Sequence, residues 1–419
     1  MKLALCAVIV SLVALTASAQ ESSLCQGALC GGDSLGPFFD KLEAGARPDR
    51  RPLNILQIGD SHSAGENFAG GWRELLQAHY GGGGRGEMMP GKPYDGYMVR
   101  GVTVEQSAGW VTQTIFDAPF RDLQEHALFG ATGYRQTAQA AGAQMTLSAD
   151  TPDFTFNRFV VCAVNGPGAG AYSIQLGAAV TKVNLDAPTT NVVCTTVRAE
   201  RRESVAEVTV ESGPVTLTSW GSFADNGGVT VSNFGVVGTQ IKNYAETDDA
   251  AVRAELETYA PDLIVIEFGT NDGFVGHFEP EDYELTLRSQ IARMRRLSHN
   301  TPILLLGAPD ADTDRTALAD NGPAEAGTPR PAPGFWYPPP ALADVREIQR
   351  RVARSMGVAF WDWASRMGGP GTADRWANAD PPLMRKDRVH YTPTGGRKLA
   401  ALLDADFEAA KAAYILSAR

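Results

Sequence analysis

Short apolar runs alternate with segments of helical periodicity near both ends of the chain, whereas the middle of the chain lacks this alternation. The runs have the length of buried strands, and the periodic segments have the apolar spacing of helices that cover a sheet. Strands joined by helices run parallel and form an α/β/α layered fold. The predicted strands are 53–58, 229–235, 262–268, 302–307 and 357–361, and the predicted helices are 67–80, 239–246, 250–259, 281–298, 341–356 and 394–416.

Residues 101–228 have a different pattern, in which short segments rich in Val, Thr and Phe are separated by Gly, Asn and Asp. This pattern is typical of an all-β fold such as a sandwich, jelly roll or barrel. Predicted parallel strands lie on both sides of it. We therefore expect an all-β insertion at 101–228 within a discontinuous α/β domain, 20–100 and 229–419. Residues 20–50 predict a loop-rich lead-in, and the Pro- and Gly-rich stretch 320–340 predicts a long surface loop.

The first residues have the features of an export signal. Lys2 supplies a positive charge, residues 3–15 are almost entirely apolar, and Ala17-Ser18-Ala19 is a small-x-small cleavage site. At about 13 residues, the run is too short to span a bilayer as a helix. The alternative is an N-terminal core helix. We expect a signal peptide at 1–19, a mature chain without an integral membrane segment, and a periplasmic or extracellular location.

The cysteines fit that location. Cleavage would remove Cys6 and leave Cys25, Cys30, Cys162 and Cys194. An even number of cysteines in an exported chain predicts disulfides, and four cysteines allow three pairings. Proximity in the sequence favours Cys25–Cys30 and Cys162–Cys194. A zinc site is less favoured because no His stands at ligand spacing from these residues.

The charge balance excludes one class of partner. The chain has 37 Lys and Arg against 48 Asp and Glu, a formal net charge of −11. A protein without a basic excess has little to neutralise the phosphates of nucleic acid. We therefore expect no nucleic-acid partner.

Gly59-Asp60-Ser61-His62 follows the first predicted strand. In an open parallel sheet, active sites gather at the carboxyl ends of the strands. A Ser on the sharp turn from strand to helix can present its hydroxyl outward with a helix N-terminus behind it. The alternative is that Asp60 or Ser61 only caps the helix at 67–80.

Two further segments hold side chains that could act together with Ser61. Asn271, in Gly269-Thr270-Asn271-Asp272 after the third strand, can donate its amide to a developing oxyanion, or can simply form a turn. In Asp387-Arg388-Val389-His390, before the last helix, Asp387 can orient His390, which can then deprotonate Ser61. The Asp-x-x-His spacing alone is common, so its position in the chain carries the argument.

Glycines after the second strand could supply a further oxyanion donor. Gly lets a main-chain N–H approach a ligand closely. Gly238, at the start of a predicted helix, is our choice, and Gly235 is the alternative. Either glycine could equally be an ordinary turn residue.

Taken in chain order, the Gly-Asp-Ser segment, the strand-end glycine, the Gly-x-Asn-Asp segment and Asp-x-x-His resemble the four blocks of the SGNH, or GDSL-type, hydrolase superfamily. The resemblance spans about 53–100 and 229–416. It implies a flavodoxin-like three-layer α/β/α fold. It also implies Ser61 as nucleophile, His390 as base and Asp387 as the residue that orients it. The Ser61 N–H, the Gly238 N–H and the Asn271 side chain would be the oxyanion donors.

His62 departs from the common GDSL form, in which this position is Leu. The Gly-Asp-Ser-His variant, the export signal, the segments GGGGRG (81–86) and PYDGY (93–97), and the β-rich insertion together resemble the peptidoglycan O-acetylesterase branch. The inserted module of that branch is similar to carbohydrate-binding module family 35. The inserted stretch of this chain shows no motif for sugar binding.

The resemblance implies a secreted serine esterase that removes O-acetyl groups from a cell-wall glycan, with no metal or organic cofactor and an O-acetylated polysaccharide as its partner. One alternative is a lipid or other carbohydrate esterase, or an acetyltransferase, on the same scaffold. The other is an inactive glycan-binding protein. No strongly apolar lid for a long acyl chain is evident in the sequence.

Overall fold

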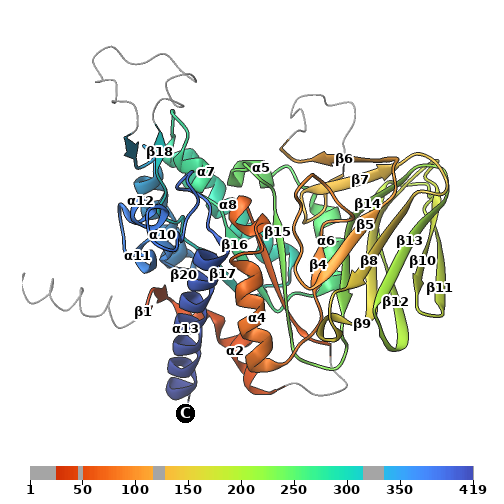
Figure 1. Ribbon diagram of the computed structural model, residues 1–419, viewed down its shortest axis with the longest axis horizontal. Helices are drawn as coiled ribbons and strands as arrows, with labels where there is room; N and C mark the ends of the chain where they lie inside the picture. The colour runs from red at the N-terminus through yellow and green to blue at the C-terminus, as the bar shows by residue number, and fades with distance from the viewer. Residues whose placement is uncertain (1–24, 46–50, 117–127, 315–334, 419) are drawn as a thin grey trace, which may run out of the picture.

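A twisted parallel sheet forms the centre of one half of the molecule (Figure 1). The computed structural model describes residues 25–45, 51–116, 128–314 and 335–418. The predicted signal peptide and most of the predicted loop at 320–340 lie outside these residues. The parallel strands lie in the order β15-β3-β16-β17-β20, where they are β3 (Leu53–Gly59), β15 (Val229–Gly235), β16 (Leu263–Glu267), β17 (Ile303–Leu306) and β20 (Ala359–Trp361).

The chain leaves β3 for one edge of the sheet and then builds outward on the other side, which is the strand order of flavodoxin-like folds. The strands are apolar on both faces of the sheet, so helices cover both faces. One layer is α6 (Asp249–Tyr259), α8 (Pro280–Leu297) and α10 (Leu342–Met356). The other is α2 (Gly36–Glu43), α4 (Ala69–Tyr80) and α13 (Pro393–Ala418).

Short elements connect these layers. They are η1 (Gly32–Leu35), α3 (Ser61–Ala64), α5 (Ile241–Tyr244), α7 (Thr270–Gly273), α11 (Trp363–Met367), α12 (Thr372–Ala377) and the strand pair β18 (Thr313–Asp314) and β19 (Trp336–Tyr337).

The prediction of a loop-rich lead-in is wrong for residues 25–45, which form two short strands and two helices. There β1 (Cys25–Gln26) and β2 (Leu29–Cys30) form a hairpin that extends the parallel sheet beyond β20, and α2 follows. The hairpin strands are too short to show a period in the sequence. In α2, Phe38, Phe39 and Leu42 are buried against the sheet layer, which is the spacing of one helix face.

The stretch between α4 and β15 forms two antiparallel sheets that pack around one core, as predicted for a β-sandwich. One sheet has the order β11-β10-β13-β8-β5 and the other has the order β12-β9-β14-β7-β6, with β4 pairing to β14. Their bounds are β4 (Gly86–Met88), β5 (Val102–Gln106), β6 (Trp110–Thr114), β7 (Tyr134–Ala138), β8 (Gln144–Ala149), β9 (Phe156–Asn165), β10 (Ala171–Leu176), β11 (Ala179–Asn184), β12 (Asn191–Glu203), β13 (Val205–Ser212) and β14 (Val215–Phe223), with η2 at Pro152–Phe154.

The predicted fold class, an α/β/α domain with a β-rich insertion, is thus confirmed. The domain boundaries at 100 and 229 stay a prediction. β4 lies before the first of them and yet pairs with β14 of the β-rich region.

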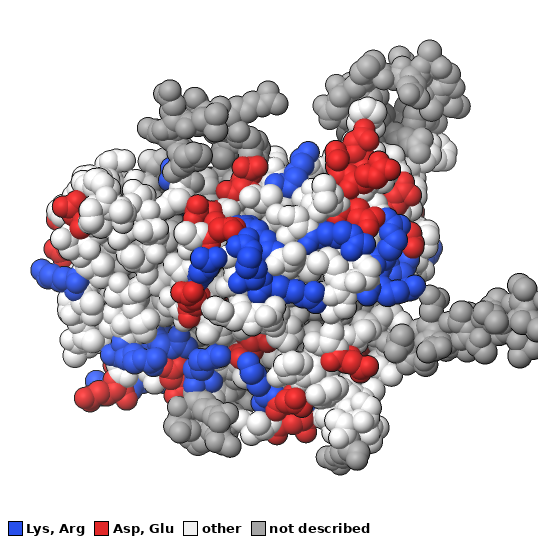
Figure 2. Space-filling model, turned by 180° about the vertical axis from the view of Figure 1, so that it is seen from behind, with Lys and Arg blue, Asp and Glu red and all other residues white. Residues whose placement is uncertain are grey.

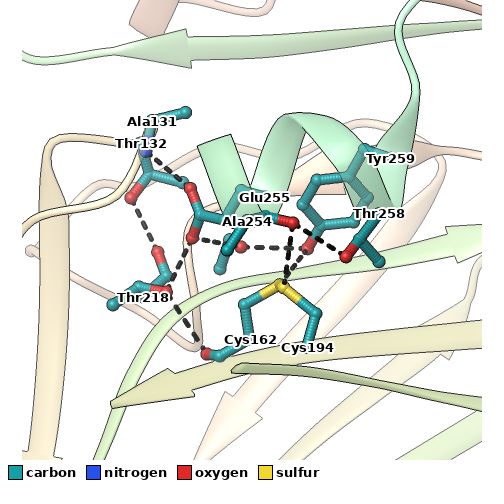
Figure 3. The surroundings of a disulfide bond; sticks show 10 residues. Ala131, Thr132, Cys162, Cys194, Thr218, Ala254, Glu255, Thr258 and Tyr259 are labelled. Atoms are coloured by element: carbon teal, nitrogen blue, oxygen red, sulfur yellow. Dashed lines mark hydrogen bonds between the residues drawn. A yellow bond between two sulfur atoms is a disulfide. The ribbon is translucent and has the colours of Figure 1, made fainter. Parts of the chain in front are cut away.

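Helix α6 joins the two halves. Figure 3 shows Glu255 of α6 next to the β-rich strands and near the disulfide. Its carboxyl group accepts hydrogen bonds from the Ala131 N–H (2.5 Å), the Thr218 hydroxyl (2.6 Å) and the Ser219 hydroxyl (2.8 Å). The hydroxyl of Tyr259 lies 3.6 Å from Cys162 Sγ. This buried contact fixes the β-rich region on the α/β layers.

Both predicted disulfides are present, Cys25–Cys30 in the β1–β2 hairpin and Cys162–Cys194 between β9 and β12. In the part of the chain that the structure describes, no helix is both long and apolar enough to cross a membrane. On the face behind the view of Figure 1, basic side chains form a band with acidic ones beside them (Figure 2). Ion pairs link the outer helices, including Arg351–Glu284 between α10 and α8 and Arg296–Asp249 between α8 and α6.

Candidate active site

The site is built at the carboxyl end of β3, the strand next to the edge strand β15. Gly59 is the last residue of the strand, Asp60 is the N-cap, and α3 begins at Ser61. At this turn the main chain passes very close to the end of β16, since a Cβ at Gly59 would lie 2.2 Å from the Glu267 carbonyl oxygen. Gly235, at the end of the adjacent β15, is equally crowded, since a Cβ there would lie 2.0 Å from the Ala64 nitrogen. Tight packing of main chains therefore explains both glycines.

The predicted nucleophile, base and orienting residue form one hydrogen-bonded chain. Ser61 Oγ lies 2.9 Å from His390 Nε2, and His390 Nδ1 lies 2.9 Å from Asp387 Oδ2. The other carboxyl oxygen of Asp387 accepts the main-chain N–H groups of Val389 and His390, each at 3.0 Å. These contacts fix the ring with Nδ1 toward the carboxylate and Nε2 toward the serine, the geometry of a Ser-His-Asp triad.

Hydrogen bonds keep Asp387 ionised. Partial burial by itself would raise its pKa, but the His390 ring and two main-chain N–H groups hold the pKa of this carboxyl well below its usual range. Arg388 is in the left-handed region (φ 55°), which lets the loop turn back toward α3. The Arg388 guanidinium is held by Asp374 at 2.9 Å and lies 3.9 Å from the ring centre of Trp336, so the loop is anchored from outside.

Asn271 lies at the start of α7, just after β16, and its side chain is already engaged. Its amide nitrogen donates to the Thr239 carbonyl (2.9 Å) and to Asp60 Oδ2 (3.2 Å). Both amide hydrogens therefore have acceptors, and service as an oxyanion donor requires the substrate to replace one of them. The longer bond, to Asp60, is the weaker of the two.

The predicted main-chain donors are Ser61 and Gly238. Among the described residues, neither N–H has a hydrogen-bond acceptor. Gly238 has a φ of 82°, which favours glycine, and it directly precedes Thr239, whose carbonyl holds the Asn271 amide. Gly238 and Asn271 are thus brought together, whereas Gly235 is buried in the packing of β15 against α3.

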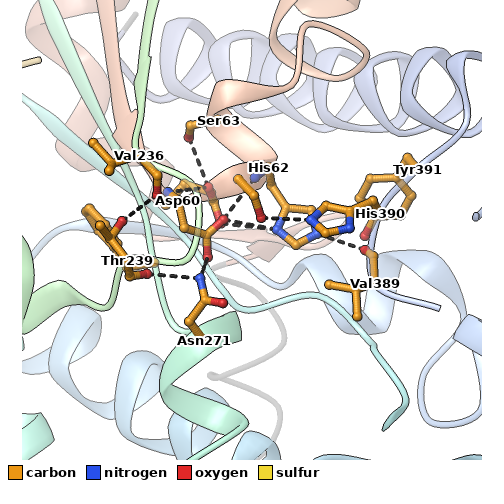
Figure 4. A network of polar contacts seen from close by, with 12 residues as sticks. Asp60, His62, Ser63, Val236, Thr239, Asn271, Val389, His390 and Tyr391 are labelled. Atoms are coloured by element: carbon orange, nitrogen blue, oxygen red, sulfur yellow. Dashed lines mark hydrogen bonds and ion pairs between the residues drawn. The ribbon is translucent and has the colours of Figure 1, made fainter. Parts of the chain in front are cut away.

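Asp60 and His62 form a buried pair whose part in the site the sequence does not reveal (Figure 4). Asp60 Oδ1 lies 3.1 Å from His62 Nδ1 and accepts the His62 main-chain N–H at 2.9 Å. His62 Nε2 lies 3.0 Å from the carbonyl oxygen of Val389, the residue before the predicted base. Both ring nitrogens thus face acceptors, so each carries a hydrogen and the ring is an imidazolium.

Electrostatics agree with this protonation. Burial by itself lowers the pKa of His62, but the hydrogen bond and charge of Asp60, with smaller contributions from Glu267 and the Val389 carbonyl, raise it to about 9. Glu267 is the last residue of β16. Its Oε2 accepts a hydrogen bond from the Ser63 hydroxyl (2.9 Å), whereas its Oε1 has no hydrogen-bond partner among the described residues. Burial and the Asp60 charge raise the pKa of Glu267 well above its usual range. A neutral Glu267 leaves one anion and one cation in the buried cluster.

The atoms of Asp60, His62 and Glu267 also lie close enough together to hold a metal ion. Both ring nitrogens of His62 are occupied by hydrogen bonds, however, so we interpret the cluster as a buried ion pair. Prediction from the sequence missed Glu267, and the one signal for it was a charged residue at the end of an otherwise apolar strand.

A cavity of about 260 Å³ opens beside this cluster, and its walls include Ser61, His390, Tyr94, Met98 and Val237. A larger cavity of about 510 Å³ lies at the opposite end of the sheet, where β3 and β15 begin. Its buried carboxylate, Asp262, is already paired with Lys41 and Arg51. The predicted site therefore coincides with the smaller cavity.

A serine, a histidine and an aspartate linked in this way on a flavodoxin-like sheet define a carboxylic ester hydrolase of the SGNH type. Residues 204–398 match the model of the GDSL-like Lipase/Acylhydrolase family, which supports a carboxylic ester hydrolase. The match includes Asn271, Asp387 and His390 and begins after Ser61.

Among solved structures, the chain is similar to one described as a peptidoglycan O-acetylesterase, at 25% identity and a TM-score of 0.72, covering 91% of this chain and 97% of that one. A family two carbohydrate esterase from Clostridium thermocellum in complex with cellohexaose is 14% identical over 65% of this chain and 94% of that one, at a TM-score of 0.28. A putative GDSL-like lipase from Parabacteroides merdae is 20% identical over 44% of this chain and 75% of that one, at a TM-score of 0.30. No curated protein matches the chain.

Proposed function

We propose that this chain is an exported serine esterase that removes O-acetyl groups from a cell-wall glycan, and that the glycan is peptidoglycan. The hydrogen-bonded chain from Ser61 through His390 to Asp387 is the observation that carries the reaction type. The substrate is suggested by the similarity, over nearly the whole chain, to the structure of a peptidoglycan O-acetylesterase. Two disulfides agree with an exported protein.

The mechanism follows from the positions of the side chains. Ser61 Oγ attacks the acetyl carbonyl carbon while His390 Nε2 takes the hydroxyl proton, and the ionised Asp387 stabilises the imidazolium that forms. The N–H groups of Ser61 and Gly238 and the Asn271 amide receive the negative charge on the carbonyl oxygen. The intermediate collapses as His390 returns the proton to the sugar oxygen, leaving an acetyl ester on Ser61.

The second half of the reaction reverses these roles. A water molecule gives a proton to His390 and attacks the acetyl carbonyl, and the second tetrahedral intermediate releases acetate and restores the Ser61 hydroxyl. The acyl group is small, so the 260 Å³ cavity has to hold only the acetyl group and the adjacent sugar atoms. We further propose that the strands of the β-rich region form an inserted module, 101–228, that is similar to a carbohydrate-binding module.

The test compares acetate release from O-acetylated peptidoglycan and from O-acetylated xylan. The proposal predicts faster release from peptidoglycan. Faster acetate release from xylan would contradict the proposal that peptidoglycan is the substrate. Preference for octanoate over acetate esters would indicate a lipid esterase. An acetylated sugar product in the presence of an acceptor would indicate transfer rather than hydrolysis.

A further inference from the structure

The cavity at Ser61 does not end at the acetyl site. A second cavity of about 510 Å³ adjoins it, and Asn67, Met98 and Arg385 line both. The second cavity is also lined by Val102, Thr103 and Val104 of β5, an edge strand of the sandwich. A continuous cleft therefore runs from the reacting serine to the edge of the β-rich region.

The charge of this second cavity is opposite to that of the protein. Its charged lining residues are Lys92, Arg100, Arg385 and a single acid, Glu66, in a chain of net charge −11. Glu66 is buried, and its carboxylate is bound by Arg73 (2.9 Å) and Arg85 (2.5 Å) from inside the molecule. The only acid in the lining is therefore already neutralised.

The basic side chains that line the second cavity differ in whether they have an ion-pair partner. Arg100 contacts Glu74 at 3.3 Å and the Asn67 side-chain oxygen at 3.2 Å. Within the described residues, the ammonium of Lys92 and the guanidinium of Arg385 have no carboxylate partner, and both side chains are exposed. Two unpaired cations thus face a cleft that leads to the nucleophile.

Arg385 also lies next to the reacting groups along the chain. Its main-chain N–H donates to the His390 carbonyl at 2.7 Å, and its carbonyl accepts the Arg388 N–H at 3.1 Å. It therefore stands at the base of the loop that carries Asp387 and His390, where the two cavities meet. A group bound by Arg385 would lie beside the acetyl group that Ser61 attacks.

We infer that this second cavity is a subsite for a carboxylate carried on a short aliphatic stem of the same acetylated glycan, held by Arg385 and Lys92. The guanidinium can bind both carboxylate oxygens, and the lysine adds a point charge. The apolar walls, Val99, Val102 and Val104, suit an aliphatic stem rather than a fully polar ligand. The inference rests on the proposed function, since it concerns the glycan that this enzyme deacetylates.

The experiment uses the full chain and soluble O-acetylated peptidoglycan fragments, either with free carboxylates or with the carboxylates converted to amides. Wild-type enzyme should show a kcat/KM higher by roughly three- to tenfold for the free carboxylates, mainly through a lower KM. Arg385→Gln and, separately, Lys92→Gln should each reduce this preference. Lys182→Gln, on the exposed outer strand β11, is the matched control and should keep the wild-type preference. Added salt should weaken the preference, because the subsite is open to solvent.

The outcomes separate the subsite from the proposed function. Equal rates on carboxylate and amide fragments, or a preference unchanged in both variants, would overturn the subsite while leaving the glycan esterase intact. Hydrolysis of p-nitrophenyl acetate without acetate release from any acetylated glycan would overturn both.

Discussion

At the scale of single residues, Asp60 connects the three parts of the site. One carboxyl oxygen binds the ring and main-chain N–H of His62, and the other binds the amide of Asn271. Through His62 Nε2 the connection reaches the Val389 carbonyl and so the loop of the predicted base. Asp60 and His62, the residues on either side of the proposed nucleophile, thus hold the proposed oxyanion donor and the loop of the proposed base in place.

The charge of His62 predicts how its contribution depends on pH. In the folded protein its pKa is raised from 6.5 to about 9, so protonation of His62 stabilises the fold. This stabilisation is fully present below pH 6.5 and is lost as the pH rises through about 9. We expect the difference in melting temperature between wild type and His62→Gln to be largest near pH 6 and to shrink above pH 9. Thermal unfolding of both proteins across this range measures it. A constant difference would show that the ring is neutral.

Asn271 gives a prediction about the rate. If its amide leaves Asp60 for the oxyanion, Asn271→Ala should lower kcat by about 10²- to 10³-fold with little change in KM. Steady-state kinetics on an activated acetate ester measures both constants. A variant with nearly wild-type kcat would show that the amide stays with Asp60 and Thr239 and only braces the loop.

At the scale of elements, the sequence was most informative where a periodic pattern was long. The α8 helix and the β15 strand match the predicted segments closely, whereas β1 and β2 are two residues each and have no period to detect. The triad could be predicted because each member follows a strand or precedes a helix of the α/β fold. The Asp60–His62 pair could not, because its partners Val389 and Asn271 are remote in sequence and only folding brings them together.

The close approach of β15 and α3 makes a prediction at this scale. In Gly235→Ala the new Cβ would meet the Ala64 nitrogen at 2.0 Å and the Asp60 carbonyl oxygen at 2.4 Å, neither of which can move without moving the turn that holds Ser61. We expect a loss of about 1–3 kcal/mol in the free energy of unfolding, together with lower activity. Gly276→Ala is the control, since a Cβ there meets nothing within 4 Å. Equal stability of the two variants in denaturant titrations would contradict the packing argument.

At the scale of the whole molecule, residues from both ends of the chain build one site, and the β-rich region lies between them in sequence. Contacts through α6 determine where that region sits, and the cleft beside Ser61 reaches its edge strand β5. The sequence predicted the insertion but could not place it, because the buried partners of Glu255 are residues of a separate sheet and a loop.

Removal of this anchor should destabilise the molecule. Glu255→Ala leaves the Ala131 N–H and the Thr218 and Ser219 hydroxyls without their buried acceptor. An unmade buried hydrogen bond costs roughly 1–3 kcal/mol, so the loss should be about 3 kcal/mol or more. Glu257→Ala, at an exposed position of the same helix, should change little. Denaturant titrations that gave the same free energy of unfolding for both variants would show that α6 does not anchor the two halves.

The central claim is that Ser61 forms the acetyl-enzyme. The most direct test is acetate release from O-acetylated peptidoglycan by wild type, by Ser61→Ala and by Ser289→Ala, a control on the exposed face of α8. We predict that Ser61→Ala folds normally and loses activity by about 10³-fold or more, while Ser289→Ala retains the wild-type rate. Wild-type acetate release by Ser61→Ala would contradict the account.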